Sequence, residues 1–174
     1  MSNPQIRVTE PDWSREQMRS REWNPGKFLL ASLRDYQRYQ AHGGVIDGLL
    51  RRWAVLFHRL WSTVRGADIA LSCQIGGGLL LPHPNGVVLY PGALIGPNCL
   101  IFQQVTLGTR GKPGAPRLAG HVDVGAGTKL LGHITVGPHA LVGANAVVLS
   151  DVPAHGMVVG NPAVVKLAKQ AGRQ

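Results

Sequence analysis

The chain has 174 residues, enough for one domain with a sizeable core, and it contains 23 Gly, 12 Pro and only 6% aromatic residues. A core of small aliphatic side chains with frequent glycine is typical of short strands joined by tight turns. The formal net charge of +9 suits an anionic partner. No nucleic-acid-binding motif accompanies that charge, so we expect no nucleic acid to bind.

The N-terminal stretch, residues 1–24, is polar and charged, and we expect it to be loosely ordered. No part of the chain has the roughly 18 consecutive apolar residues of a transmembrane helix, and the N-terminus lacks the apolar segment of a secretory signal. We therefore expect a cytoplasmic protein. Two cysteines in that compartment argue against a disulfide framework, and no Cys/His cluster has zinc-ligand spacing, so we expect no metal.

Two helices are predicted next, separated by Gly43 and Gly44. The first covers residues 26–42. The second lies within residues 43–66, where apolar side chains recur at steps of three and four. Its opposite face carries four arginines, Arg51, Arg52, Arg59 and Arg65. A basic amphipathic helix can lie on a membrane surface, but this apolar face is wide enough for protein packing. We favour packing on the following zone or on another subunit.

A six-residue repeat occupies residues 66–166. Aliphatic residues recur at this step in three runs: Ile69, Ile75, Leu81 and Val87; Leu89, Ile95, Ile101 and Leu107; and Leu118, Val124, Leu130, Val136, Val142 and Val148. A hexapeptide period predicts a mainly β protein with a parallel β-helix, in which three repeats form one triangular coil. Cys73 and Cys99 fall at the small inward position and are expected to be buried packing residues. We divide the chain into a helical N-terminal region (1–65), the β-helix (66–166) and a C-terminal tail (167–174).

Two departures from the period are candidates for function, because a solenoid buries its regular positions. One is a slip of two residues between Val87 and Leu89, close to His83. The other is the Gly/Pro-rich, basic stretch at 108–118, "GTRGKPGAPRL".

The zone resembles the hexapeptide-repeat acyltransferases, and within them the serine acetyltransferase branch. The matching stretches are "DI" at 68–69, "IGGGLLLPHPNGVVL" at 75–89, "QVTLGTRGK" at 104–112, "VGAGTKLLGHITVG" at 124–137 and "VGANAVVLSDVPAHGMVVGNPAVV" at 142–165. The resemblance implies a left-handed β-helix, an acetyl-CoA donor, and a homotrimer, or a dimer of trimers, with active sites between neighbouring prisms.

The resemblance also implies roles for individual residues. His83, in the "-H-x-x-G-" turn, would be the general base that deprotonates an acceptor hydroxyl. Asp68, fifteen residues earlier, would orient its imidazole; the alternative is a turn aspartate bonded to its own backbone. CoA would lie along Gly108, Ala126 and Ala144, with Lys166 or Lys129 at a phosphate, unless these side chains are simply solvated. The remaining turn histidines, His121, His133, His139 and His155, are expected to be ordinary surface residues.

The acceptor is less clear, because the chain departs from the serine enzymes. Their excursion loop carries an Arg-His pair that helps to hold the amino acid, and this shorter loop lacks it. Pro82 replaces the aspartate that precedes their histidine. We therefore predict a saccharide acceptor in surface-polysaccharide biosynthesis. Serine is the alternative, with a carboxylate clamp formed by Arg110, Lys112 and Arg117. A non-catalytic trimeric scaffold is a third hypothesis.

Overall fold

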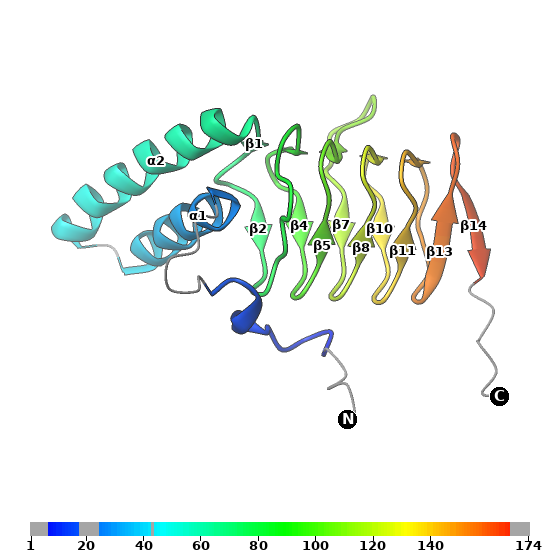
Figure 1. The fold of residues 1–174 in the computed structure, drawn as a ribbon, viewed down its shortest axis with the longest axis horizontal. Helices are drawn as coiled ribbons and strands as arrows, with labels where there is room; N and C mark the ends of the chain where they lie inside the picture. The colour runs from blue at the N-terminus through cyan, green and yellow to red at the C-terminus, as the bar shows by residue number, and fades with distance from the viewer. Residues whose placement is uncertain (1–6, 18–24, 43, 168–174) are drawn as a thin grey trace.

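The computed structural model describes residues 7–17, 25–42 and 44–167. A short 3-10 helix, Trp13–Arg15, precedes the α-helices α1 (Pro25–His42) and α2 (Val45–Arg65), and both predicted helices are thereby confirmed. A coil of short strands follows (Figure 1). The strands are β1 (Asp68–Ile69), β2 (Gln74–Ile75), β3 (Val88–Leu89), β4 (Leu94–Ile95), β5 (Leu100–Ile101), β6 (Thr106–Gly108), β7 (Arg117–Leu118), β8 (Asp123–Val124), β9 (Lys129–Leu131), β10 (Thr135–Val136), β11 (Leu141–Val142), β12 (Val147–Val148), β13 (Gly156–Val159) and β14 (Val164–Leu167).

The strands form three parallel sheets that are the faces of a prism. Sheet A has the order β1-β3-β6-β9-β12, sheet B the order β10-β7-β4-β2, and sheet C the order β14-β13-β11-β8-β5. Every pairing is parallel except that of β13 with β14. From β1 to β13, consecutive strands lie on different faces and bond to the equivalent strands of the neighbouring coils, whereas β14 pairs with β13 on the same face. The parallel β-helix predicted from the hexapeptide period is confirmed.

The repeat positions stack inside the prism in register. On sheet A, Ile69 pairs with Leu89, Leu89 with Leu107, Leu107 with Leu130, and Leu130 with Val148. All of these side chains are at most 4% exposed. They therefore form a continuous aliphatic ladder along the prism axis, in which each coil contacts only its neighbours.

The first coil shows where the slip lies. Leu89, not Val87, pairs with Ile69, and Val87 fills the smaller inward position two residues earlier. Eight residues separate the inward Leu81 from Leu89, whereas six separate Ile101 from Leu107. The two additional residues therefore belong to the turn that contains His83.

The helices cover one end of the prism. Leu29, Leu30 and Leu33 of α1 are buried in the same hydrophobic cluster as the inward residues of the coil. From α2, Ala54 and His58 are buried, and His58 Nε2 lies 2.8 Å from the backbone oxygen of Ile69. Most of the apolar face of α2 is exposed within one chain, so this face does not pack on the following zone; the alternative, packing on another subunit, stays a prediction.

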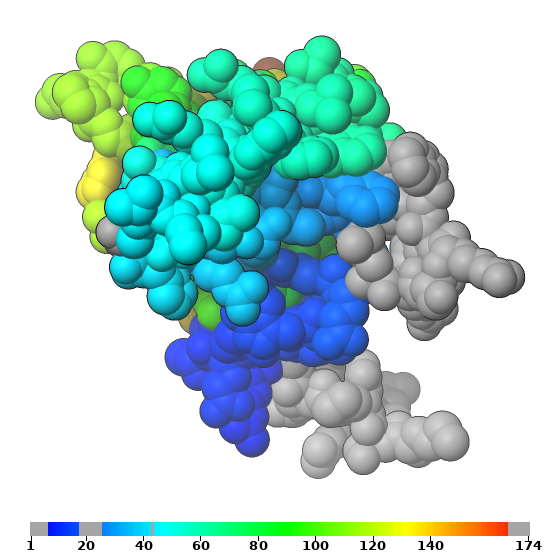
Figure 2. All heavy atoms as spheres, turned by 90° about the vertical axis from the view of Figure 1, so that its left-hand side faces the viewer, coloured from blue at the N-terminus to red at the C-terminus, as the bar shows by residue number. Residues whose placement is uncertain are grey.

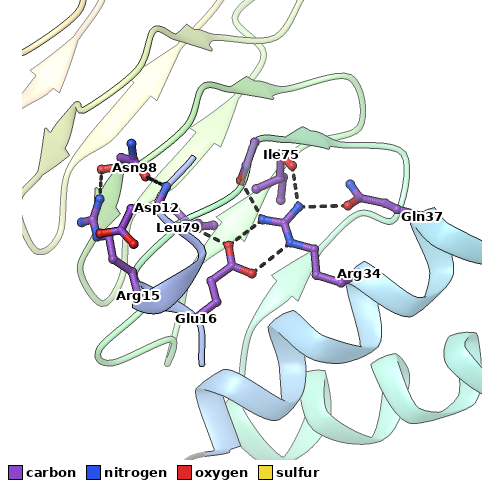
Figure 3. A network of polar contacts seen from close by, with 9 residues as sticks. Asp12, Arg15, Glu16, Arg34, Gln37, Ile75, Leu79 and Asn98 are labelled. Atoms are coloured by element: carbon purple, nitrogen blue, oxygen red, sulfur yellow. Dashed lines mark hydrogen bonds and ion pairs between the residues drawn. The ribbon is translucent and has the colours of Figure 1, made fainter. Parts of the chain in front are cut away.

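A polar network joins α1 to the first coil (Figure 3). The Arg34 guanidinium donates to both carboxylate oxygens of Glu16, at 2.8 and 3.0 Å, and to the backbone oxygens of Ile75 and Gly76, each at 2.6 Å. Glu16 also accepts from the Leu79 N–H at 3.0 Å. Both charges are largely buried, with side-chain exposures of 18% and 10%, so each depends on the other.

Besides Glu16, the Asn98 side chain fixes the N-terminal segment 7–17 to the prism. The Asn98 amide donates to the backbone oxygens of Arg7 and Glu10, both at 2.8 Å, and accepts from the Asp12 N–H at 2.7 Å. The expectation of loose order is therefore wrong for residues 7–17, while residues 1–6 and 18–24 lie outside the described residues.

Replacing Arg34 with glutamine should lower the free energy of unfolding by about 3 kcal/mol, because it leaves the Glu16 carboxylate and two backbone oxygens without their donor. Denaturant unfolding measures this change. Arg38→Gln is the matched control, because Arg38 is exposed on the same helix. Equal stability of the two variants would contradict the role of the network.

Candidate active site

The turn 82–86 connects sheet C to sheet A and presents His83 at the surface. Leu80 forms a bridge with Leu100 of sheet C, and the chain re-enters sheet A at β3. Pro82 and Pro84 flank His83 and fix φ on both sides of it. The turn ends at Gly86, whose φ is +68°. Glycine adopts this left-handed conformation without a steric penalty because it has no Cβ. The histidine is exposed on this constrained turn.

Asp68 begins β1, directly below this turn in the preceding coil. The Gly86 N–H donates to the Gly66 oxygen at 2.7 Å, and the Asp68 N–H donates to the Val87 oxygen at 2.8 Å. The end of the His83 turn is therefore bonded to the segment that carries Asp68. Both side chains are exposed at one prism corner, and no hydrogen bond joins them in the described structure. The Asp68 carboxylate makes no bond to its own backbone either.

The same corner continues along the axis as a column of turns. The Gln104 N–H donates to the Asn85 oxygen, the Gly127 N–H to the Gln103 oxygen, and the Asn145 N–H to the Ala126 oxygen, at 2.8 to 2.9 Å. Ala126 and Ala144 thus occupy successive turns of the corner that carries His83. Small side chains on both leave the backbone of this edge accessible.

The other residues predicted to bind CoA lie elsewhere. Gly108 is buried at the far end of β6, and Lys166 is exposed on β14 at the C-terminal end of the prism. Lys129 donates to the Gln104 oxygen at 2.8 Å and to Thr106 at 3.0 Å. It is therefore a structural residue of the corner in this structure.

The excursion loop carries the three candidate acceptor-binding cations, Arg110, Lys112 and Arg117. It leaves sheet A after β6 and returns at β7 of sheet B, and it projects from the upper edge of the prism in Figure 1. The Lys112 N–H donates to the Arg110 oxygen at 2.7 Å, forming a tight bend. All three cations are exposed, and none has an acidic partner in the described part of the chain. The loop and the His83 turn lie at opposite edges of sheet A, whose strands are two or three residues long, roughly 10 Å at most.

Two further polar groups beside the candidate site were not singled out from the sequence. Within the described residues, Gln103 Oε1 and Arg65 Nε are buried and have no hydrogen-bond partner. Gln103 immediately precedes Gln104, which is bonded to the His83 turn, and Arg65 immediately precedes Gly66. The sequence feature that could have indicated Gln103 is its position one coil after that turn. No pattern pointed to Arg65, because it lies at the end of a helix.

A cavity beside the helices does not contain these residues. It has a volume of about 780 Å³ and lies between α1 and strands β2 and β4, lined among others by Gln37, Gln40 and Cys73. Cys73 is its only titratable lining residue, and burial raises the pKa of that thiol to about 11. The Cys99 pKa is also raised to about 11 by burial. Both thiols are protonated at neutral pH, so the cavity holds no general base.

The sequence and the fold that carry this geometry are similar to those of known proteins. No protein-family model matches the chain. It is 43% identical over 110 residues to the serine acetyltransferase of Synechococcus elongatus, covering 62% of this chain and 45% of the relative, and 40% identical over 116 residues to that of Escherichia coli K12, covering 65% and 42%. Soybean serine acetyltransferase complexed with serine superposes with a TM-score of 0.71 at 35% identity, over 83% of this chain and 58% of that one. A serine acetyltransferase complexed with CoA gives 0.70 at 30% identity, over 83% and 58%.

The chain carries a hexapeptide-repeat, left-handed β-helix similar to that of the serine acetyltransferases. The fold and the resemblance inferred from its motifs are thus confirmed. The chain spans less than half the length of the two curated relatives.

The saccharide acceptor predicted from the sequence is wrong, because these relatives are serine acetyltransferases. The assignment to surface-polysaccharide biosynthesis depended on that acceptor and is wrong as well. The prediction gave too much weight to the missing Arg-His pair on the excursion loop. That loop still presents three cations, which can supply the positive charge that a carboxylate requires.

Three histidines of this serine acetyltransferase-like β-helix form a column at the corner between sheets B and C. His121 Nδ1 lies 2.7 Å from His139 Nδ1, and the rings of His139 and His155 stack with centroids 4.9 Å apart. The desolvation of His139, followed by the charges of His121 and His155, lowers the His139 pKa below 6.5. These three histidines are surface residues that contact one another, and the 18-residue spacing of His121 and His139 is the pattern in the sequence that corresponds to this contact.

The His139 pKa makes stability depend on pH. The folded state disfavours the imidazolium, so the unfolded chain binds more protons as the pH falls through 6.5, and stability is lost below that value. The buried His58, whose pKa is also lowered by desolvation, acts in the same direction.

We expect His139→Asn to be less sensitive to acid than the parent between pH 7 and the lowered His139 pKa. Asparagine suits the position because Asn98 and Asn145 adopt the same positive φ at corresponding turns, 62 and 57 against 57 for His139. Thermal unfolding at a series of pH values measures the difference, which isolates His139 from His58. Parallel stability curves would contradict the effect.

Proposed function

We propose that this chain is an acetyl-CoA-dependent serine O-acetyltransferase with His83 as its general base. The observation that carries the proposal is the His83 turn, held against the Asp68 segment in a β-helix that is 43% identical to a serine acetyltransferase. Neighbouring structures complexed with serine and with CoA support the two substrates.

The reaction needs one proton to move twice. His83 removes the proton from the serine hydroxyl while the oxygen attacks the thioester carbonyl of acetyl-CoA. The tetrahedral intermediate then expels the CoA thiolate, which takes the proton from the imidazolium. The products are O-acetylserine and CoA, and no acyl-enzyme forms. Asp68 is a positioning residue that orients the ring and stabilises its cationic form.

The CoA arm is proposed to follow the corner that begins at the His83 turn. Ala126 and Ala144 lie on successive turns of that corner, so an extended pantetheine there would reach the histidine with its thioester. Gly108 lies at the other end of β6, away from this path, whereas Lys166 would meet a phosphate. Backbone amides and carbonyls supply most of the hydrogen bonds in this arrangement.

Serine needs partners for its carboxylate, and the proposal assigns this role to Arg110, Lys112 and Arg117. Their exposure and lack of acidic partners among the described residues fit an anion. They lie across sheet A from His83. A homotrimer, as the resemblance implies, would close the site between prisms and exclude water; a dimer of trimers is compatible with this arrangement.

His83→Ala should lower kcat by at least about a hundredfold, since it removes the general base. His42→Ala, an exposed histidine on α1, is the matched control and should retain parental activity. The measurement is serine-dependent release of CoA. Asp68→Asn should also lower kcat, because the ring of His83 loses the carboxylate proposed to orient it. Full activity of His83→Ala would refute the mechanism.

Replacing Arg110, Lys112 or Arg117 with glutamine should raise the KM for serine by about tenfold at each residue that contacts the carboxylate, with a smaller effect on kcat. The KM for acetyl-CoA should stay constant, and Arg38→Gln should change neither constant. If serine fails to accelerate CoA release from the parent protein, the proposed acceptor is wrong.

A further inference from the structure

The outward face of α2 is a continuous apolar surface, which we call the α2 stripe. Its members recur at steps of three and four residues, which places them on one side of the helix. They are Val45, Ile46, Leu49, Leu50, Trp53, Leu56, Phe57, Leu60 and Val64, and every one is exposed. Leu49, Trp53 and Leu56 in the middle are 58%, 55% and 56% exposed. Large aromatic and aliphatic side chains in an unbroken row on a surface mark an interaction site.

Most of the stripe lies outside the contacts that hold the fold together. α2 is buried against the rest of the chain at Ala54 and His58, and the stripe residues Leu50, Trp53 and Phe57 line a groove shared with α1. In Figure 2, which looks onto the helical end of the molecule, α2 lies in front of α1 and nearest the viewer. Beside the stripe, a groove of about 410 Å³ opens between the two helices, lined by Tyr39, Leu50 and Phe57 among others. The apolar surface therefore extends from the crest of α2 into a recess.

The charges of α2 that border the stripe are positive, and Asp35 of α1 is an acidic residue in the lining of the adjoining groove. Arg52 follows Leu49 by three residues and precedes Leu56 by four, and Arg59 follows Leu56 by three, so both arginines flank the same edge. Both are exposed. The only acidic residue of α2, Asp47, accepts from the Gly44 N–H at 3.1 Å at the other end of the helix. The whole chain has a formal net charge of +9.

We propose that α2 binds the surface of an anionic phospholipid bilayer, with the stripe in the acyl boundary and Arg52 and Arg59 at the lipid phosphates. An amphipathic helix with arginines beside a Trp/Phe/Leu face lies in the plane of such an interface. The 21 residues of α2 give a contact about 30 Å long. No helix among the described residues is long and apolar enough to cross a membrane, so the binding is peripheral.

A second copy of the chain is the less favourable occupant. Two α2 helices packed face to face would bring together two arginine-bordered surfaces, and like charges repel. An anionic bilayer complements the same charges. Its fluid surface also fits a convex helix, without the shape complementarity that a protein partner must provide.

The test is sedimentation of the full chain with phosphatidylcholine vesicles, with and without phosphatidylglycerol. We expect binding to the mixed vesicles, weaker binding to phosphatidylcholine alone, and loss of binding at high salt. Leu49→Ser combined with Leu56→Ser should weaken binding at least tenfold. Arg52→Gln and Arg59→Gln should each weaken binding to the mixed vesicles by about fivefold. Val164→Ser, an exposed apolar position on β14, is the control and should bind like the parent.

Circular dichroism and sedimentation equilibrium without vesicles accompany each variant. Absence of vesicle binding by the parent, or equal binding by the double leucine variant, overturns the proposal. So does a smaller assembly in that variant than in the parent, which would show that another copy covers the stripe. Serine acetyltransferase activity is measured separately and without lipid, because the inference does not rest on the proposed function.

Discussion

The structure depends on one constraint: every coil of the β-helix must place an aliphatic side chain directly above its equivalent in the coil below. Backbone hydrogen bonds run between coils, and the ladder through Ile69, Leu89 and Leu107 supplies the buried surface that makes those bonds favourable. A change in the length of a coil is tolerated only where it does not shift the ladder. Additional residues are therefore confined to the corners, and the two long corners carry the candidate catalytic and acceptor-binding groups.

This constraint explains which parts of the site the sequence could predict. Asp68 and His83 were paired by motif, and the period indicated that fifteen residues nearly complete a coil; the backbone bonds of Gly86 and Asp68 now show the two segments in contact. Periodicity also predicted the burial of Cys73 and Cys99. The six-residue period assigned Val87 to the wrong repeat position. Counting in steps of six cannot distinguish the inward aliphatic position from the smaller inward position two residues earlier.

The contacts outside the period could not be predicted, because they join groups with no fixed spacing. Arg34 binds backbone oxygens about forty residues later, and Asn98 holds a segment about ninety residues earlier. Nothing in a local pattern distinguishes these two side chains from solvated ones. The prediction of a saccharide acceptor was wrong for a related reason. The sequence shows that the Arg-His pair is missing from the loop. It does not show how many cations the folded loop presents to a carboxylate, because that number depends on the three-dimensional bend of the loop.

The ends of the prism show why α2 is unusual. A solenoid needs caps, because its terminal coils have no neighbour on one side. At the C-terminal end, β14 turns back antiparallel on β13 and ends the repeat. At the N-terminal end, α1 supplies Leu29, Leu30 and Leu33 to the core and Arg34 to the first coil. With α1 already acting as the cap, α2 contributes only a narrow buried face. Capping therefore does not account for the nine large apolar side chains on its outer face, and their retention in an exposed row requires a contact outside the chain.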